Sequence, residues 1–238
     1  MTGWVALGLA PEGVRACAMQ GDRLLEQVAA GSEAAALEAL SEPADRLLRI
    51  GDGTPAALPA PILPKAGPGL PGFSQKAPAD VIGGWVRLWL AGFLATRPDW
   101  DGVIAATEGP VSHWIQLSAG EAVSSQSFLT PRLVDALGGA ESPDADAMAD
   151  SLSRPERLAA HLRAAEVSGN RQALTGHLIG AELAAARPYW LGQQVAVIAP
   201  PPAPVATALK TQGVPCETHS PDDLLAPGLA AVGKALGM

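Results

Sequence analysis

The stretch WVALGLAPEGVRACAMQGDRLLEQVA, residues 4–29, decides the fold that the sequence predicts. Its apolar runs are separated by Ala10-Pro11-Glu12-Gly13 and by Gly21-Asp22, which are typical turn sequences. We therefore expect three strands joined by tight turns, followed by an alanine-rich helix that Ser32 caps. The expected elements cover residues 4–9, 14–20, 24–29 and 32–40.

The same order of elements recurs about a hundred residues later in VIAATEGPVSHWIQLSAGEAVSSQSF, residues 103–128. The turn Thr107-Glu108-Gly109-Pro110 shares a proline, a glutamate and a glycine with the first turn of the earlier stretch. Thr130 is expected to cap the following helix, with Pro131 in its first turn. The expected elements cover residues 103–106, 112–117, 122–128 and 131–137.

A repeated unit of three strands and a helix predicts two similar α/β domains that face each other across a cleft, with the first turns meeting there. We place the N-terminal domain at residues 1–97 and the C-terminal domain at residues 98–238. Asp80 is expected to cap a bridging helix over residues 80–96. The proline- and glycine-rich stretch of residues 51–78 predicts an irregular loop with at most one short strand.

The second half of the chain contains two further features that bear on the fold. Helices are expected over residues 155–166 and 170–187. Gly176 and Gly180 lie one turn apart in the second of these, and each costs about 1 kcal/mol relative to alanine inside a helix. They indicate that this helix packs closely against another backbone.

Residues 195–212 predict a buried strand, a turn and a helix, and the turn is Pro200-Pro201-Pro202-Ala203-Pro204. Enzymes often hold nucleotides at such a junction, where glycines let backbone N–H groups approach phosphate. Proline has no N–H group and a fixed φ angle. The position is typical of a nucleotide site, whereas the residues are not suited to phosphate.

Composition limits the function further. A formal net charge of −8 argues against nucleic acid or an anionic membrane surface as the main partner. Cys17 and Cys216 form no metal-binding pair, and the spacing of the four histidines is not typical of a metal site, so no metal is predicted. No secretory signal is visible and the most apolar helix is too short to span a bilayer, so we expect a cytoplasmic protein.

Three segments carry a resemblance to known proteins: Leu174–Glu182 (LTGHLIGAE) continued by residues 199–216, Gly109–Gln116 with Trp114, and Val5–Glu26 with Arg15. With the duplicated unit, they resemble the sugar-kinase/actin/Hsp70 superfamily, whose members duplicate a ribonuclease H-like domain around an ATP cleft. More narrowly, the chain resembles the 2-dehydro-3-deoxygalactonokinase family. The resemblance implies an actin-like ATPase fold and ATP-dependent phosphorylation of a keto-deoxy sugar acid, with magnesium.

The residues that the family uses for chemistry are replaced in this chain. The resemblance implies that Gly8 stands where the family's Asp organises magnesium. Gly83-Gly84-Trp85 replaces a Gly-Glu-Glu segment, and Thr130-Pro131-Arg132-Leu133 replaces Thr-Gly-Glu-Leu. The replaced catalytic positions are therefore Gly8, Gly84 and Arg132. The positions that would line the cleft are Ala10, Pro11, Glu12, Arg15, Gly109, Pro110, Pro200, Pro201 and Pro202.

These replacements oppose phosphoryl transfer, which needs a metal held by carboxylate and donors on the phosphates. Pro11, Pro110 and Pro200 to Pro202 remove N–H donors, whereas Glu12 and Glu108 add negative charge. A carboxylate about 4 Å from a phosphate charge costs roughly 4 kcal/mol at an effective dielectric constant of 20. The sequence therefore predicts a kinase fold without a working kinase site and without a bound cofactor.

Three interpretations remain open. In the first, the chain is a catalytically impaired homologue, a pseudoenzyme that binds a ligand such as a small sugar acid or regulates another protein. In the second, it is an active kinase that uses ATP and magnesium, with Asp52, Glu108 or Asp135 holding the metal or acting as the base. In the third, it is an interaction module or homodimer without a small ligand. Arg15 matches a family arginine that either binds an anion or makes an ordinary salt bridge.

Overall fold

The computed structural model describes residues 3–41 and 46–238. The chain packs as two compact units, which are described separately below. Unit 1 comprises Met1–Asp101, Leu117–Ser124 and Pro221–Met238, and unit 2 comprises Gly102–Gln116 and Ser125–Ser220. Two similar domains bounded at residue 97, with first turns that meet across a cleft, stay a prediction.

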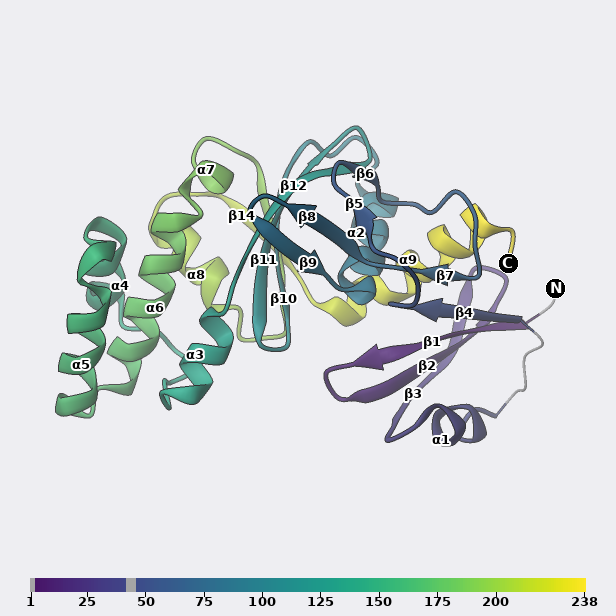
Figure 1. Ribbon diagram of the computed structural model, residues 1–238, viewed down its shortest axis with the longest axis horizontal. Coiled ribbons are helices and arrows are strands. Elements are labelled where there is room, and N and C mark those ends of the chain that lie inside the picture. The colour runs from purple at the N-terminus through teal and green to yellow at the C-terminus, as the bar shows by residue number, and fades with distance from the viewer. Residues whose placement is uncertain (1–2, 42–45) are drawn as a thin grey trace. The chain divides into compact units, whose positions relative to one another are not determined.

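Unit 1 is built on a five-stranded sheet with the order β3-β2-β1-β4-β7 (Figure 1). β1 pairs antiparallel with β2 from Gly3↔Gln20 to Ala10↔Gly13 and parallel with β4, so it lies inside the sheet. The three strands expected over residues 4–29 are thus confirmed. The strands are β1 (Gly3–Ala10), β2 (Gly13–Gln20), β3 (Arg23–Ala30), β4 (Arg46–Ile50) and β7 (Gly69–Leu70).

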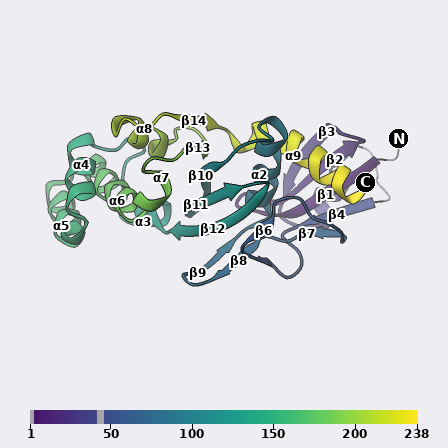
Figure 2. The ribbon, with the colours of Figure 1, turned by 90° about the horizontal axis from the view of Figure 1, so that it is seen from above.

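Helices cover both faces of this sheet. Helix α1 (Glu33–Glu38), capped by Ser32 as expected, packs with Val5 and Leu7 on one face. Helix α9 (Pro221–Leu236) lies along the sheet on the other face, where a Cβ atom on Gly233 would lie 2.7 Å from the Trp4 ring (Figure 2). Because helices cover both faces of the sheet, the inner strands carry apolar residues on both faces.

The segment between β4 and α2 differs from the expected irregular loop. It contains four further short strands, three of which form a sheet of order β5-β8-β9. They are β5 (Ala56–Ala57), β6 (Ala60–Pro61), β8 (Phe73–Lys76) and β9 (Ala79–Ile82). Asp80 lies in β9 and accepts a hydrogen bond from Val81 N at 2.9 Å, so the expected cap is wrong and α2 (Gly84–Thr96) begins four residues later.

Arg87 of α2 explains why this segment is ordered. Its guanidinium is buried, donates to the carbonyl oxygens of Ile62, Pro71 and Pro61 at 2.8–2.9 Å, and lies 4.6 Å from the Phe73 ring centroid. Burial lowers the pKa of Arg87 to about 10. One side chain thereby holds three carbonyl oxygens of a segment whose sequence has no periodic pattern of apolar residues.

Unit 2 contains strands in the order β14-β13-β10-β11-β12, with β10, β13 and β14 parallel. The outer ends of β11 and β12 belong to unit 1, where β12 pairs with β6. The strands are β10 (Gly102–Glu108), β11 (Val111–Ser118), β12 (Glu121–Phe128), β13 (Val195–Ile198) and β14 (Cys216–His219). The strands expected over residues 103–128 and 195–199 are therefore confirmed.

Six α-helices of the described chain belong to unit 2, and α6 packs its apolar side on the sheet with Trp114 and Val197. They are α3 (Thr130–Ala136), α4 (Ala145–Ser153), α5 (Leu158–Ser168), α6 (Arg171–Ala185), α7 (Arg187–Trp190) and α8 (Pro204–Thr211). Thr130 is the first residue of α3 rather than its cap, which corrects the expectation. The helix expected over residues 155–166 is a 3₁₀ turn, Pro155–Arg157, followed by α5.

Helices α4, α5 and α6 lie side by side at one end of unit 2 (Figure 1). A Cβ atom on Gly180 would lie 2.2 Å from the carbonyl oxygen of Met148, and one on Gly176 would lie 2.4 Å from that of Asp144. The expectation that these glycines bring α6 against another backbone is confirmed, and α4 is that backbone. Across the described residues, no helix has the length and apolar character needed to cross a membrane.

Candidate functional site

Unit 2 holds a pocket of about 400 Å³ beside the carboxyl end of β13. Its walls come from the ends of β10 and β11, from α3 and α6, and from the loop that leads into α8. Pro200, Pro201 and Pro202 line it, so the structure brings the predicted proline turn to a cavity. The remaining lining residues are Thr107, Ser112, Thr130, Pro131, Val134, Asp135, Gly139, Ala140, Glu141, Thr175, Ile179, Glu182, Ala199, Ala203, Pro204 and Val205.

Glu182 of α6 is the buried polar group of this pocket and is only 3% exposed. Its Oε1 atom accepts hydrogen bonds from Ser112 Oγ and from Trp114 Nε1, each at 2.9 Å. Its Oε2 atom is also buried. Besides Ser112 and Trp114, the Thr130 side chain also hydrogen-bonds to this carboxyl group, so three side chains stabilise it.

Burial raises the pKa of the Glu182 carboxyl, because an apolar surrounding disfavours the charged form. Thr130, Trp114 and Ser112 act in the opposite direction by stabilising the carboxylate. Glu182 was not among the predicted site residues. Its signal in the sequence was a glutamate inside an otherwise apolar helix, close to Gly176 and Gly180.

The proline turn gives the pocket an apolar wall and few donors. Pro200, Pro201, Pro202 and Pro204 have no N–H group, so Ala203 and Val205 are the backbone donors between residues 200 and 205. None of the described residues that line the pocket is Lys, Arg or His. This lining lacks the cations and the N–H cradle with which proteins usually hold phosphate.

Gly8 and Gly84, two positions where the resemblance implies replaced catalytic residues, lie in unit 1 and are closely packed. A Cβ atom on Gly8 would lie 2.4 Å from the carbonyl oxygen of Ile50 and 2.9 Å from its Cβ atom. A Cβ atom on Gly84 would lie 2.4 Å from Gly51 N and 2.7 Å from the carbonyl oxygen of Leu70. Neighbouring backbone thus occupies the space that a carboxylate side chain would need at either position.

The first turn of unit 1 is a tight hairpin in which Ala10 pairs with Gly13, with Pro11 and Glu12 at its tip. Arg15 donates from Nε to Glu12 at 2.6 Å and from Nη1 to Asp222 at 3.3 Å, and its guanidinium lies 5.7 Å from the Trp85 ring centroid. Arg15 was expected either to bind an anion or to make an ordinary salt bridge, and in the structure it makes salt bridges with Glu12 and Asp222. These two carboxylates balance its positive charge.

The second turn, Gly109-Pro110, lies beside the start of α3 in unit 2. Gly109 has a φ of 53°, and the Pro110 carbonyl accepts a hydrogen bond from Arg132 N at 3.2 Å. The side chain of Arg132 is exposed. Gly109, Pro110 and Arg132 do not line the pocket that contains Pro200 to Pro202, whereas Thr130 and Pro131 do.

The carboxylates that an active kinase would use in this chain belong to different units, and Glu108 of unit 2 lies 4.0 Å from His113 Nε2. Asp52 lies 3.7 Å from Arg49 on the surface of unit 1, and Asp135 is an exposed residue at the unit 2 pocket. Within residues 3–41 and 46–238, no three His, Cys, Asp or Glu side chains are grouped so that they could hold a metal ion.

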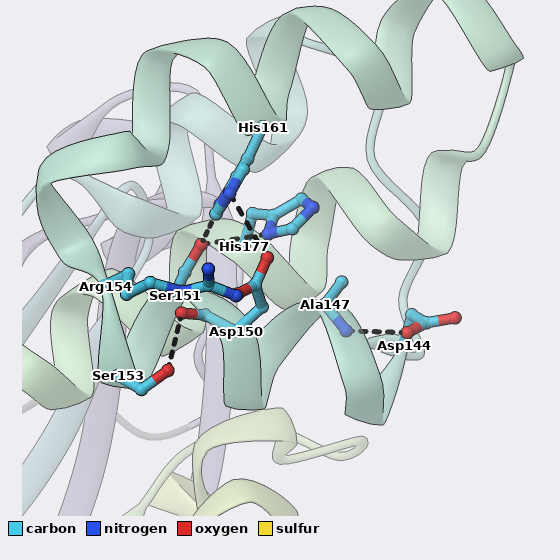
Figure 3. A network of polar contacts seen from close by, with 8 residues as sticks. All are labelled: Asp144, Ala147, Asp150, Ser151, Ser153, Arg154, His161 and His177. Carbon is cyan, nitrogen blue, oxygen red and sulfur yellow. Dashed lines mark hydrogen bonds and ion pairs between the residues drawn. The ribbon is translucent and has the colours of Figure 1, made fainter.

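A second polar cluster joins α4, α5 and α6 (Figure 3). Ser151 Oγ lies 3.1 Å from His161 Nδ1 and 2.9 Å from His177 Nδ1, while His161 Nε2 lies 3.2 Å from Asp150 Oδ2. Serine, histidine and aspartate together resemble a nucleophilic site. Ser151 has no exposed surface, however, so no substrate reaches its hydroxyl and the cluster links helices instead.

Comparison with known proteins identifies relatives of this chain. The sequence pattern of the 2-keto-3-deoxy-galactonokinase family matches residues 57–232. A crystal structure described as a putative 2-dehydro-3-deoxygalactonokinase from Sinorhizobium meliloti superposes with a TM-score of 0.80 at 20% identity, covering 99% of each chain. No curated protein matches the sequence significantly.

Two more distant structures share the fold. The (R)-2-hydroxyglutaryl-CoA dehydratase component A of Acidaminococcus fermentans has a TM-score of 0.54 at 12% identity and covers 99% of each chain. The activator of the 2-hydroxyisocaproyl-CoA dehydratase from Clostridium difficile, solved with bound ADPNP, has a TM-score of 0.52 at 11% identity. That match covers 98% of this chain and 95% of the other. The expected α/β fold of the actin-like ATPase and sugar kinase type is confirmed, while its ribonuclease H-like halves stay a prediction.

Proposed function

Because this chain belongs to the 2-keto-3-deoxy-galactonokinase family, we propose that it is a ligand-binding member of the family that no longer transfers phosphate. The observation that carries the proposal is the packing at Gly8 and Gly84. Backbone atoms of Ile50 and Gly51 stand 2.4 Å from the Cβ positions of these two residues. The loss of carboxylates there is accompanied by closure of the space that they would occupy.

ATP and magnesium do not fit the residues at the family's chemical positions. Magnesium prefers carboxylate and phosphate oxygens in octahedral geometry, and Gly8 offers no side-chain oxygen. Phosphate is usually held by backbone N–H groups and cations, and Pro200, Pro201 and Pro202 supply neither. No step of phosphoryl transfer is therefore assigned to this chain.

The proposal retains a small molecule as the ligand. The 400 Å³ pocket of unit 2, with a buried carboxylate and apolar walls, has the character of a small-molecule site. A keto-deoxy sugar acid is the ligand suggested by the family name, and the cytoplasm is the location that a sugar-acid kinase homologue would occupy. A protein that binds this ligand without phosphorylating it would act as a regulator rather than as an enzyme.

The test measures ADP release in the presence of ATP, magnesium and 2-dehydro-3-deoxygalactonate, with a well-folded preparation verified by circular dichroism. We expect a rate indistinguishable from that without protein. Sustained ADP release that depends on the sugar acid would contradict the proposal. In that event Asp52→Ala, Glu108→Ala and Asp135→Ala identify the carboxylate that supports catalysis, since each is a candidate for the metal or base role.

A further inference from the structure

The polar cluster between α4, α5 and α6 contains two buried histidines that share one serine (Figure 3). His161 of α5 and His177 of α6 are each 9% exposed, and their ring centroids lie 4.6 Å apart. Each Nδ1 atom lies within hydrogen-bond distance of Ser151 Oγ, at 3.1 Å for His161 and 2.9 Å for His177. Two titratable rings from neighbouring helices are therefore joined through one hydroxyl group. We call these two rings, Ser151 and Asp150 the histidine cluster.

The single hydroxyl hydrogen limits how protons can be arranged in the histidine cluster. Ser151 can donate to only one Nδ1 atom, so the other Nδ1 atom carries a hydrogen and donates to Ser151 Oγ. His161 Nε2 lies 3.2 Å from Asp150 Oδ2, and it carries a hydrogen because a bare nitrogen would repel the carboxylate. With both rings neutral, the hydrogen bonds therefore run from His177 through Ser151 and His161 to Asp150.

One extra proton fits this arrangement, whereas two do not. A proton added to His161 Nδ1 reverses the hydrogen bonds, since Ser151 then donates to His177 Nδ1, and a proton added to His177 Nε2 leaves them unchanged. When both rings are protonated, both Nδ1 atoms are donors that face Ser151 Oγ, and neither can accept the serine hydrogen. Two like charges then also lie in rings whose centroids are 4.6 Å apart and shielded from water, which disfavours the doubly protonated state.

The charges around the rings do not remove this penalty. Burial, followed by the charge of His161, lowers the pKa of His177, although the carboxylates of Asp144 and Asp150 act in the opposite direction. His177 is therefore neutral above its ordinary value of 6.5, and its protonation at lower pH opposes the folded arrangement. The charged side chains that act on the rings or on Asp150 are Asp144, Asp150 and Arg154 of α4 and Arg157 of the 3₁₀ turn.

Helix α5 depends on the histidine cluster because it buries few side chains. Of the residues of α5, all of which the structure describes, His161 and Ala165 are the buried ones. Ala165 and the partly buried Leu162 pack against an apolar patch on the two neighbouring helices. This patch consists of Ala147 of α4 and Ala173 and Leu174 of α6. Loss of the contacts of His161 would thus leave α5 with little to hold it, and its separation would uncover the patch.

We propose that the histidine cluster is a pH switch that holds α5 against α4 and α6 at neutral pH and releases α5 in mildly acidic solution, when both histidines are protonated. The release exposes the apolar patch. The switch does not rest on the proposed function, because no residue of α5, a helix that the structure describes in full, lines the unit 2 pocket.

Hydrogen–deuterium exchange of the intact chain tests the switch, with rates corrected for the effect of pH on exchange from an unfolded chain. We expect the protection factor of α5 to fall at least about tenfold between about pH 7.5 and about pH 5.5. The protection factor of the buried strand β13 should change less than about twofold. No fall in α5 would overturn the proposal, as would an equal fall in β13, which would mean that unit 2 unfolds as a whole.

Variants assign the effect to the two rings. His177→Asn and His161→Asn each leave one titratable ring, and the cluster accommodates one proton, so α5 protection should change less than about twofold over the same pH range in either variant. His219→Asn alters a histidine of β14 outside the cluster and is the matched control, which should keep the wild-type fall. A tenfold fall in either cluster variant, or its loss in the control, would contradict the assignment. If one cluster variant does not fold, the other decides, and if neither folds, the wild-type comparison of α5 with β13 decides.

Discussion

Substitution of Gly8 tests whether the space that a metal-binding carboxylate would need there is closed. A Cβ atom at this position would lie 2.4 Å from the Ile50 carbonyl oxygen and 2.9 Å from the Ile50 Cβ atom. Ordinary carbon contacts are about 3.5–4.0 Å, so β1 and β4 must separate by roughly 1 Å. Overpacking of this kind costs about 1–3 kcal/mol, and we expect Gly8→Ala to lower the free energy of unfolding by about 2 kcal/mol.

Gly8→Asp, which returns the residue expected from the family, should cost more, because the carboxylate lies beside a carbonyl oxygen. We expect a loss of about 4 kcal/mol, the sum of overpacking and an unpaired polar group. For a chain of this length about 2–4 °C of melting temperature is lost per kcal/mol, which gives a decrease of roughly 8–16 °C.

Thermal unfolding followed by circular dichroism measures both variants, and Gly31→Ala is the matched control. A Cβ atom on Gly31 would have no heavy atom within 4 Å, so its substitution should change stability by less than about 0.5 kcal/mol. Wild-type stability of Gly8→Asp together with magnesium-dependent ATP turnover would refute the argument. Such a result would mean that the structure has space for an aspartate at residue 8 and that the carboxylate alone was missing for activity.

Three further predictions concern the packing and the titration of the two units. Gly180→Ala should destabilise unit 2 by at least about 2 kcal/mol in urea unfolding, because its Cβ atom would lie 2.2 Å from the Met148 carbonyl oxygen; an unchanged midpoint contradicts the close crossing of α4 and α6. Arg87→Met should destabilise unit 1 by about 3 kcal/mol or more, since three loop carbonyls lose their donor, and retention of wild-type stability would show that water replaces the guanidinium. Burial, with the charge of His161, lowers the pKa of His177 below its ordinary value of 6.5, so the unfolded chain takes up the proton more readily and stability should fall as the pH decreases below about 6.5. The melting temperature of His177→Asn should depend less on pH over that range than that of the wild type, and identical pH profiles would contradict this assignment.

The strands of residues 4–29 and 103–128 could be predicted because each is an apolar run bounded by turn residues, which is local information. The close approach of α6 could be predicted as well, because Gly176 and Gly180 are costly in a helix unless packing requires them. The strands between residues 56 and 82 could not be predicted, since each is only two to four residues long, and Arg87, which binds carbonyl oxygens of this segment, is 16 to 26 residues away from them in sequence.

The sequence predicts the position of the candidate site but not all of the residues that form it. The proline turn at Pro200 to Pro202 indicated where a pocket lies, and the structure places a cavity there. Glu182 acquires its role from Ser112 and Trp114, which are 70 and 68 residues away and reach it through the fold alone. In the same way, Gly8 predicts a missing carboxylate through the family resemblance, but only the position of Ile50 shows that a side chain there would have no space.

The central claim is that this member of a kinase family does not transfer phosphate. A single-turnover experiment with stoichiometric protein, ATP, magnesium and 2-dehydro-3-deoxygalactonate, followed by phosphorus NMR, tests it most directly, because even very slow transfer accumulates product. The account predicts that the ATP signals persist and that no sugar phosphate appears beyond the protein-free control. Formation of one equivalent of phosphorylated sugar acid would contradict it.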